Sequence, residues 1–384
     1  NNEKANLLLE KHTFKELLAD VEQRNLQNNI VGLEASRLFA RSEINMGVDA
    51  FRDSLYAMLK RNTFLNIKFE NMLDTLGEMS RTDIYSSLKE WEQLTPLPFY
   101  SIGEPELTKV VNKGGEEFFV LKVLVSNNSD YDGIIQMNVL QNGWWYQPME
   151  DPRARKKVEI AAHTSKEFVS VWEEQIRDVE INTMVSGNLP YMIRQSIGNV
   201  KQERNKIVKD TIYTLPESSL EMPGEVIVDN EDSTLFVLST PAVVGLLPKW
   251  LDKVEDTSFK YSGISWWRAP LQWTATTNAK YYGKYIRSAY VIKSGDGSQT
   301  ATWKIPVPEA GQYELYYHVF KDDELRWNDR LQGEYHFRVA YDSEMEDAYI
   351  NLRKANEGWE QLGTYYFSAD TVRVVLTDEC KLRS

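Results

Sequence analysis

The stretch Pro308-Glu-Ala-Gly-Gln-Tyr-Glu-Leu-Tyr-Tyr317 decides the fold class, together with its downstream counterpart Gly358-Trp-Glu-Gln-Leu-Gly-Thr-Tyr-Tyr-Phe367. In each stretch, proline or glycine marks a turn, and a run rich in aromatic residues follows. Alternation with a period of two is typical of a strand that has one buried and one exposed face. The two stretches therefore predict successive strands of an all-β domain.

Neighbouring residues extend the same pattern. Apolar residues stand at every second position from Ala301 to Val307, from Tyr313 to Val319 and from Val372 to Leu376. We expect these positions to face one core, while the residues between them face solvent. The spacing predicts a jelly-roll-like β-sandwich over residues 216–384.

The first hundred residues carry a helical period instead. Thr13 and Glu16 have the spacing of a capping box. Apolar residues recur three and four positions apart from Phe51 to Leu59, and again from Phe69 to Leu76, where Gly77 is expected to end the helix. The pattern predicts a bundle of amphipathic helices over residues 1–100.

Between these parts the period is again two. Alternating apolar residues from Phe119 to Val125 precede a polar turn at 126–133, and Ile135 to Val139 resume the alternation. Short antiparallel strands at this spacing predict an immunoglobulin-like sandwich over residues 101–215. The chain as a whole is thus predicted to be a multidomain α+β protein, with a helical bundle followed by two antiparallel β-sandwiches.

Composition excludes several partners. The 384 residues carry a formal net charge of -13, which disfavours nucleic acid because phosphate binding needs a basic surface. Cys380 is the single cysteine, so neither an intrachain disulfide nor a cysteine-based zinc site is expected. No apolar run is long enough for a membrane span. The opening residues Asn1 to Asn6 lack a signal peptide, and we expect upstream domains in a longer parent protein.

Four motifs in the last third of the chain resemble the golvesin/Xly carbohydrate-binding-like domain over about residues 224–384. They are Val228-Asp-Asn230, Tyr282-Gly-Lys-Tyr-Ile-Arg287, the run from Ala301 to Leu315, and the run from Gly358 to Phe367. The resemblance implies a β-sandwich at the end of a secreted bacterial protein, often one that degrades polysaccharides. The insertion at 232–273 is longer than the corresponding loop of that family.

A second resemblance covers about residues 29–99. Met46-Gly-Val-Asp-Ala-Phe51, Phe69-Glu-Asn-Met-Leu73, Thr82-Asp-Ile-Tyr85 and Trp91 resemble the helices that follow the zinc site in gluzincin aminopeptidases of the M1 type. That family's His-Glu-x-x-His motif is missing, because the segment His12-Thr-Phe-Lys-Glu16 has no second imidazole. No catalytic residue can be carried over, and any zinc site of this kind is expected upstream of Asn1.

Tryptophans provide the candidate ligand-binding residues. Sugar-binding surfaces stack pyranose rings on aromatic side chains, and the insertion is rich in them. The candidates are Trp250, Trp266, Trp267 and Trp273. The same residues could instead pack against the domain, and packing is the more common role. We expect Trp303 and Trp359, which fall within the family motifs, to be core residues.

Catalysis has weaker signals. His318 and His336 could meet the acidic residues at 322–324, but four histidines in the chain leave little scope for a metal site. Glu344, Glu346 and Asp347 are most simply a solvated turn. We therefore expect no catalytic residue, no metal and no cofactor in this chain.

The resulting hypothesis is a non-catalytic region that binds or positions a glycan or cell-surface polymer through its last sandwich. We expect it in a secreted or envelope-attached bacterial protein, extracellular or periplasmic, anchored through a part that is missing here. Two alternatives remain open. The chain could be the trailing part of an M1-like zinc metallopeptidase, or a structural spacer.

Overall fold

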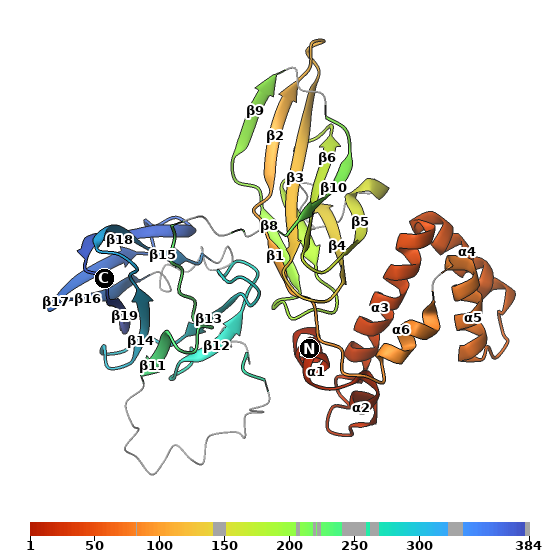
Figure 1. Cartoon of the computed structure of the whole chain (residues 1–384), viewed down its shortest axis with the longest axis horizontal. Coiled ribbons are helices and arrows are strands. Elements are labelled where there is room, and N and C mark those ends of the chain that lie inside the picture. The colour runs from red at the N-terminus through yellow and green to blue at the C-terminus, as the bar shows by residue number, and fades with distance from the viewer. Residues whose placement is uncertain are drawn as a thin grey trace. The chain divides into compact units, whose positions relative to one another are not determined.

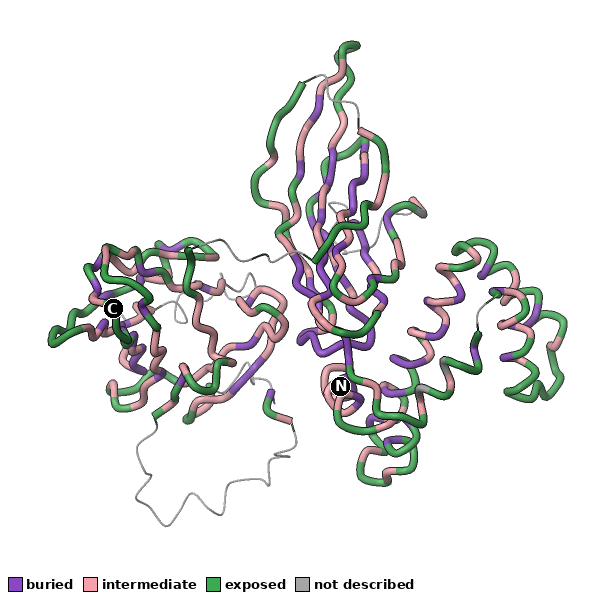
Figure 2. The backbone as a smooth tube through the Cα atoms, in the orientation of Figure 1, coloured by how far each residue is buried: buried purple, intermediate pink, exposed green. Residues whose placement is uncertain are grey.

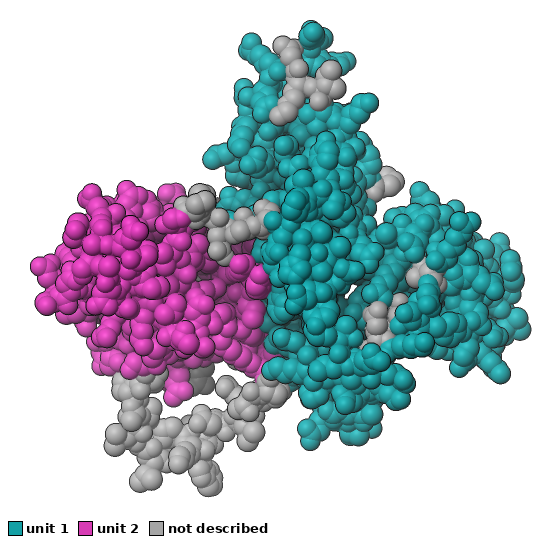
Figure 3. Space-filling model, viewed as in Figure 1, with its two compact units in different colours: residues 1–220 teal, residues 221–384 magenta. Residues whose placement is uncertain are grey.

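The structure is a computed structural model of the chain, and it describes residues 1–81, 83–140, 151–204, 208–217, 220, 224–239, 259–261, 269–321 and 333–380. The chain forms two compact units, Asn1–Leu220 and Glu221–Ser384 (Figure 3). Helices lie in the first part of the chain and antiparallel sheets follow, so the α+β class is confirmed (Figure 1).

Among the described residues, six helices form the first part of unit 1. They are α1 (Asn2–Lys11), α2 (Phe14–Ala19), α3 (Gln27–Met46), α4 (Val48–Arg61), α5 (Phe69–Ser80) and α6 (Ile84–Glu90). The capping box of α2 is confirmed, because Thr13 and Glu16 each accept a hydrogen bond from the other's backbone amide. The predicted stop at Gly77 is wrong. Helix α5 continues to Ser80, and the left-handed Arg81 ends it.

Two apolar clusters hold the helices together. Phe51, Leu73 and Leu76 are buried where α3, α4 and α5 meet. The other cluster joins α1, α2 and α3, and it also contains Val185 from the strand region. Asn6 strengthens this junction, since its buried side chain donates to the Met184 carbonyl at 2.9 Å. The helices and the strands that follow them therefore pack as one unit.

Two sheets enclose the main core of unit 1. The strands are β1 (Tyr100–Ile102), β2 (Glu106–Val111), β3 (Glu117–Asn127), β4 (Gly133–Leu140), β5 (Arg155–Ile160), β6 (Thr164–Trp172), β7 (Asp178–Asn182), β8 (Met192–Ser196), β9 (Val200–Arg204) and β10 (Thr211–Pro216). One sheet runs β10-β6-β3-β2-β9 with β1 beside β3, and the other runs β5-β4-β7-β8. All these pairs are antiparallel except β2 with β9. Figure 2 shows buried residues concentrated in the strands.

The alternating residues that predicted these strands line that core. Leu121, Val123 and Val125 of β3 are at most 1% exposed, and Met137 and Val139 of β4 face them from the other sheet. Their burial removes apolar surface from water on both sheets at once, which is the main favourable contribution to folding. Within the described residues, no helix is long and apolar enough to cross a membrane.

Unit 2 is built from shorter strands around a second core. They are β11 (Phe236–Ser239), β12 (Thr274–Thr277), β13 (Ser288–Val291), β14 (Thr300–Pro306), β15 (Gly311–Val319), β16 (Glu334–Tyr341), β17 (Glu344–Asn351), β18 (Gly358–Phe367) and β19 (Thr371–Cys380). One sheet runs β11-β14-β19-β16-β17, and β12 with β13 and β15 with β18 form separate pairs. Phe337, Val374 and Phe367 are buried in the shared core.

A histidine ties two segments of unit 1 together. The ring of His163, in the turn before β6, lies 2.7 Å from Asp130 through Nε2 and 2.8 Å from Glu217 through Nδ1. Hydrogen bonds to these carboxylates raise the pKa of His163 above its ordinary value of 6.5, and the bond to Asp130 has the larger effect. Both nitrogens face acceptors, so the arrangement favours the imidazolium form.

Replacing Phe337 by alanine should destabilise unit 2 selectively. Phe337 is fully buried, and loss of such a side chain costs about 3–5 kcal/mol of unfolding free energy. Scanning calorimetry of the whole chain should show a lower melting transition for one unit. The matched control is Phe64→Ala, because Phe64 is fully exposed and its loss should cost within about 0.5 kcal/mol. Equal effects of the two variants would contradict this core.

The His163 pairs should contribute to stability only at lower pH. Because the folded pKa is raised, the contribution is fully present below the unfolded value of 6.5 and is lost as the pH rises through the folded pKa. Melting temperatures of the wild type and of His163→Gln, compared across this range, should differ most on the acidic side. A constant difference at every pH would show that the pairs do not form.

Candidate functional site

Strands β15 and β18 form an antiparallel pair that runs from Gly311 opposite Phe367 to Val319 opposite Gly358. The register shifts once. Leu315 pairs with Gly363, but Tyr316 pairs with Gln361, so Leu362 is skipped as the extra residue of a β-bulge. Beyond this point every side chain of β18 points to the opposite face from the one that simple alternation predicts.

The inner face of the pair lies against the core of unit 2. Leu315 and Val319 from β15 and Tyr365 and Phe367 from β18 are buried there. Gly363, next to the bulge, lies under the Tyr365 ring, and a Cβ atom at this position would come within 2.7 Å of the Tyr365 hydroxyl. The glycine thus lets the ring cover the backbone at the point where the register shifts.

The outer face carries aromatic and polar side chains together. We call it the β15–β18 outer face, and its positions are Gln312, Glu314, Tyr316 and His318 from β15 and Trp359, Gln361, Thr364 and Tyr366 from β18. Three large aromatic side chains are well exposed on it, Tyr316 at 43%, Trp359 at 49% and Tyr366 at 66%. Exposed aromatic side chains that share one sheet face mark this face as a candidate binding surface.

Neighbouring rings hold Trp359 in place. His318, opposite Trp359 in the register, lies 5.3 Å away between ring centroids, and Tyr282 lies 4.9 Å away. His318 and Tyr282 also contact each other at 5.6 Å. Edge-on and tilted contacts at these distances stabilise aromatic groups beyond the area they bury. The indole is therefore fixed by packing while half of its surface remains exposed.

The same packing keeps His318 uncharged. Burial disfavours the imidazolium, and Arg287 nearby adds to the effect, so the pKa of His318 is lowered to about 4. The ring is neutral at physiological pH and presents no charge at the Trp359 end of the face.

Polar groups lie between the aromatic ones. The Tyr316 hydroxyl donates to the Glu314 carboxylate at 2.7 Å, and the Gln361 amide donates to the Thr364 hydroxyl at 3.2 Å. These groups retain further donor and acceptor capacity toward solvent. An array of exposed rings with amides, hydroxyls and a carboxylate suits a ligand that has apolar faces and many hydroxyl groups.

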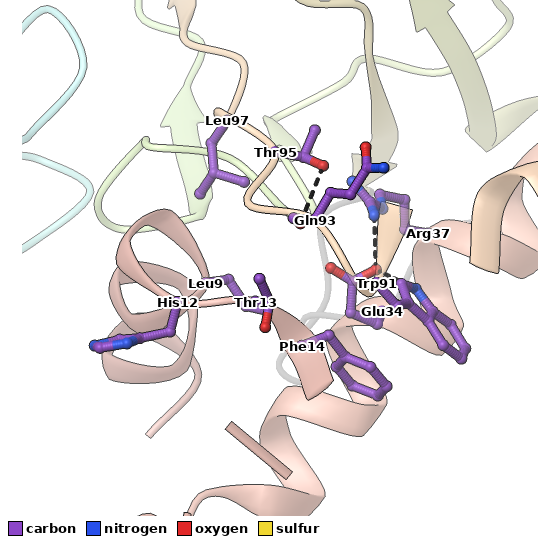
Figure 4. A pocket seen from close by; sticks show the side chains of 10 residues that line it. All are labelled: Leu9, His12, Thr13, Phe14, Glu34, Arg37, Trp91, Gln93, Thr95 and Leu97. Atoms are coloured by element: carbon purple, nitrogen blue, oxygen red, sulfur yellow. Dashed lines mark hydrogen bonds and ion pairs between the residues drawn. The ribbon is translucent and has the colours of Figure 1, made fainter. Parts of the chain in front are cut away.

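Unit 1 also contains a small hollow between its helices. It lies among α1, α2, α3 and the segment after α6, with a volume of about 20 Å³, which is room for about one water molecule (Figure 4). Glu34 lies in it, but its carboxylate already accepts from Arg37 at 2.9 Å and from the Trp91 indole at 3.0 Å. The His12 side chain points away from this pair in Figure 4. The hollow is a packing feature of the helices.

The structure tests the predictions for the tryptophans only in part. Trp250, Trp266 and Trp267 lie outside the described residues. Trp273 is half-buried and packs against the core of unit 2, as Trp303 does. The prediction that Trp359 is a core residue is wrong, because the bulge at Leu362 places it on the outer face.

Among the residues that the structure describes, acidic and histidine side chains do not form a metal site. Both nitrogens of His336 are engaged by single carboxylates, Asp347 at 2.8 Å and Glu379 at 3.2 Å. Across the described part of the chain, no three His, Cys, Asp or Glu side chains are grouped as metal ligands would be. Residues 322–324, which the sequence placed near the histidines, lie outside that part.

The fold and this face define an α+β chain whose last unit presents an aromatic surface on an antiparallel sheet. Residues 266–382 of this unit match the family model of the Golvesin C-terminal domain, which confirms the predicted resemblance over that range. The β15–β18 outer face lies entirely within the matched residues.

Other comparisons are more distant. No curated protein matches the chain. Among solved structures, a Paenibacillus xanthan lyase is similar at 15% identity and a TM-score of 0.28, over 75% of this chain and 26% of that one. Red sea bream transglutaminase is similar at 10% identity and a TM-score of 0.15, over 80% of this chain and 30% of that one. The chain thus spans less than a third of either protein.

The packing of His318 against Trp359 gives a direct test of the site. Proton NMR should show the His318 imidazole titrating near pH 4, and Trp359→Ala should move this pKa toward 6.5 because water reaches the ring. Tyr366→Ala, at the other end of the face, should leave the pKa of His318 unchanged.

The same pKa makes stability depend on pH. As the pH falls from 6.5 through about 4, the wild type should lose stability, because His318 takes up its proton at a higher pH in the unfolded chain than in the folded one. Titration near 6.5 in the wild type would contradict the packing.

Proposed function

We propose that the chain is a non-catalytic region that binds glycans through the β15–β18 outer face. The single observation that carries this proposal is the half-exposed Trp359, held by Tyr282 and His318 on a face that also exposes Tyr316 and Tyr366. Pyranose rings have apolar C–H faces that pack on such rings, and their hydroxyls bond to amides and carboxylates. The match of residues 266–382 to the Golvesin C-terminal domain supports the same reading.

The wider setting is part of the proposal. We place the chain in a secreted or envelope-attached bacterial protein, extracellular or periplasmic, with upstream domains that its binding region positions. In this proposal residues 1–100 are a helical bundle, 101–215 an immunoglobulin-like sandwich and 216–384 a jelly-roll-like sandwich. The resemblance of the helices to M1-type peptidases and the role of a plain spacer stay predictions, and the first would require a His-Glu-x-x-His motif in the full-length gene before Asn1.

Aromatic side chains of the outer face should be needed for binding. Trp359→Ala and Tyr366→Ala should each weaken binding to a soluble polysaccharide chosen from a glycan array by about tenfold, which corresponds to about 1.4 kcal/mol. Isothermal titration calorimetry measures the loss. Tyr213→Ala is the matched control, since Tyr213 is 51% exposed on β10 of unit 1 and should bind as the wild type does.

The tryptophan-rich insertion provides the competing location. A double variant, Trp266→Ala with Trp267→Ala, should retain binding if the outer face is the site. Loss of binding in that variant with normal binding in Trp359→Ala would move the site to the insertion. A glycan array without any ligand for the wild type would favour the structural spacer and overturn the proposal.

A further inference from the structure

We infer that the β15–β18 outer face selects an extended, uncharged glycan and discriminates against polysaccharides that carry carboxylates. This inference rests on the proposed function and names the class of ligand for the same face. Two independent features carry it, the charge of the face and the spacing of its aromatic side chains.

The face carries little charge, and this charge is negative. Among its eight positions Glu314 carries the single formal charge, and none is lysine or arginine. His318 adds no positive charge at neutral pH because its pKa is about 4. A uronate placed along this face would thus meet a carboxylate and lose water without gaining a cationic partner, which is unfavourable.

Two nearby cations are already engaged. Lys280 pairs with Glu357 at 3.3 Å, and Arg287 donates to the Ala279 carbonyl at 2.8 Å. Recognition of carboxylates commonly uses a bidentate arginine, and no position of the outer face provides one. Glu314 instead suits a ligand that donates hydrogen bonds, as sugar hydroxyls do.

The spacing of the aromatic groups favours a long ligand. Trp359 and Tyr366 stand about six strand steps apart when the bulge is left out, which is about 20 Å at the usual rise per residue. Tyr316 lies between these levels, opposite Gln361. One sugar ring cannot contact all three side chains, whereas a chain of several sugars along the strands can.

The charge inference is tested with two kinds of soluble polysaccharide on the whole chain. Affinity electrophoresis in hydroxyethylcellulose or glucomannan should retard the protein, and polygalacturonate or alginate should bind it at least about tenfold more weakly. Binding to the neutral polymers should change little with added salt, because no ion pair forms. Equal or tighter binding of the uronates would overturn the inference and leave the proposed function intact, whereas no binding to any polymer would overturn the proposed function itself.

A charge variant assigns the discrimination to the face. Glu314→Lys should bring uronate binding to within about tenfold of neutral binding or better. Glu309→Lys is the matched control, because Glu309 is an exposed glutamate in the turn before β15 and should leave the preference unchanged. If both variants behave alike, overall charge and not the face discriminates, and the inference fails.

Oligosaccharides of increasing length test the spacing. Calorimetry with oligomers of a neutral polymer that binds should show affinity rising until the ligand reaches both Trp359 and Tyr366. In Tyr366→Ala the rise should end at a shorter ligand. Full affinity for a disaccharide, unchanged in that variant, would show that the ends of the face do not share one ligand.

Discussion

One residue that the strand register skips determines what unit 2 presents to solvent. Without the bulge at Leu362, the Trp359 side chain would point to the same face as Tyr365 and Phe367 and would lie in the core. With it, a large aromatic side chain is moved to the outer face. Because half of the side chain stays exposed, the fold forgoes part of the stabilisation that full burial of a large apolar side chain would contribute, which is about 1.5–3 kcal/mol in all. A feature of this kind is more readily explained by binding than by folding.

The core makes this arrangement tolerable. Phe337, Val374 and Phe367 bury the inner faces of the sheets, and Gly363 lets the Tyr365 ring close over the backbone beside the bulge. Since the inner positions already fill the space between the sheets, the outer positions are free to vary in chemistry. Tyr282 and His318 then hold the Trp359 ring, so a ligand would meet a surface that is already ordered, which lowers the entropic cost of binding.

Periodicity predicted much of the fold and little of the site. The core-facing positions from Tyr313 to Val319 and the capping box of Thr13 and Glu16 follow from local spacing, and both are confirmed. The outward placement of Trp359 could not be predicted, because an extra residue in a strand leaves no clear local signal apart from Gly363. The pairing of His163 with Glu217 could likewise not be predicted, since the two residues lie 54 positions apart in the sequence and meet only in the folded sheet.

Tryptophan indole NMR tests the central claim most directly. The chain has 11 tryptophans, and selective ¹⁵N labelling with one substitution per assignment resolves each indole N–H signal. On titration with a neutral polysaccharide, the account predicts that the Trp359 signal shifts in a saturable manner while those of Trp303 and Trp172, which pack in the two cores, stay in place. A saturable shift confined to Trp266, Trp267 or Trp273, with Trp359 unchanged, would contradict it.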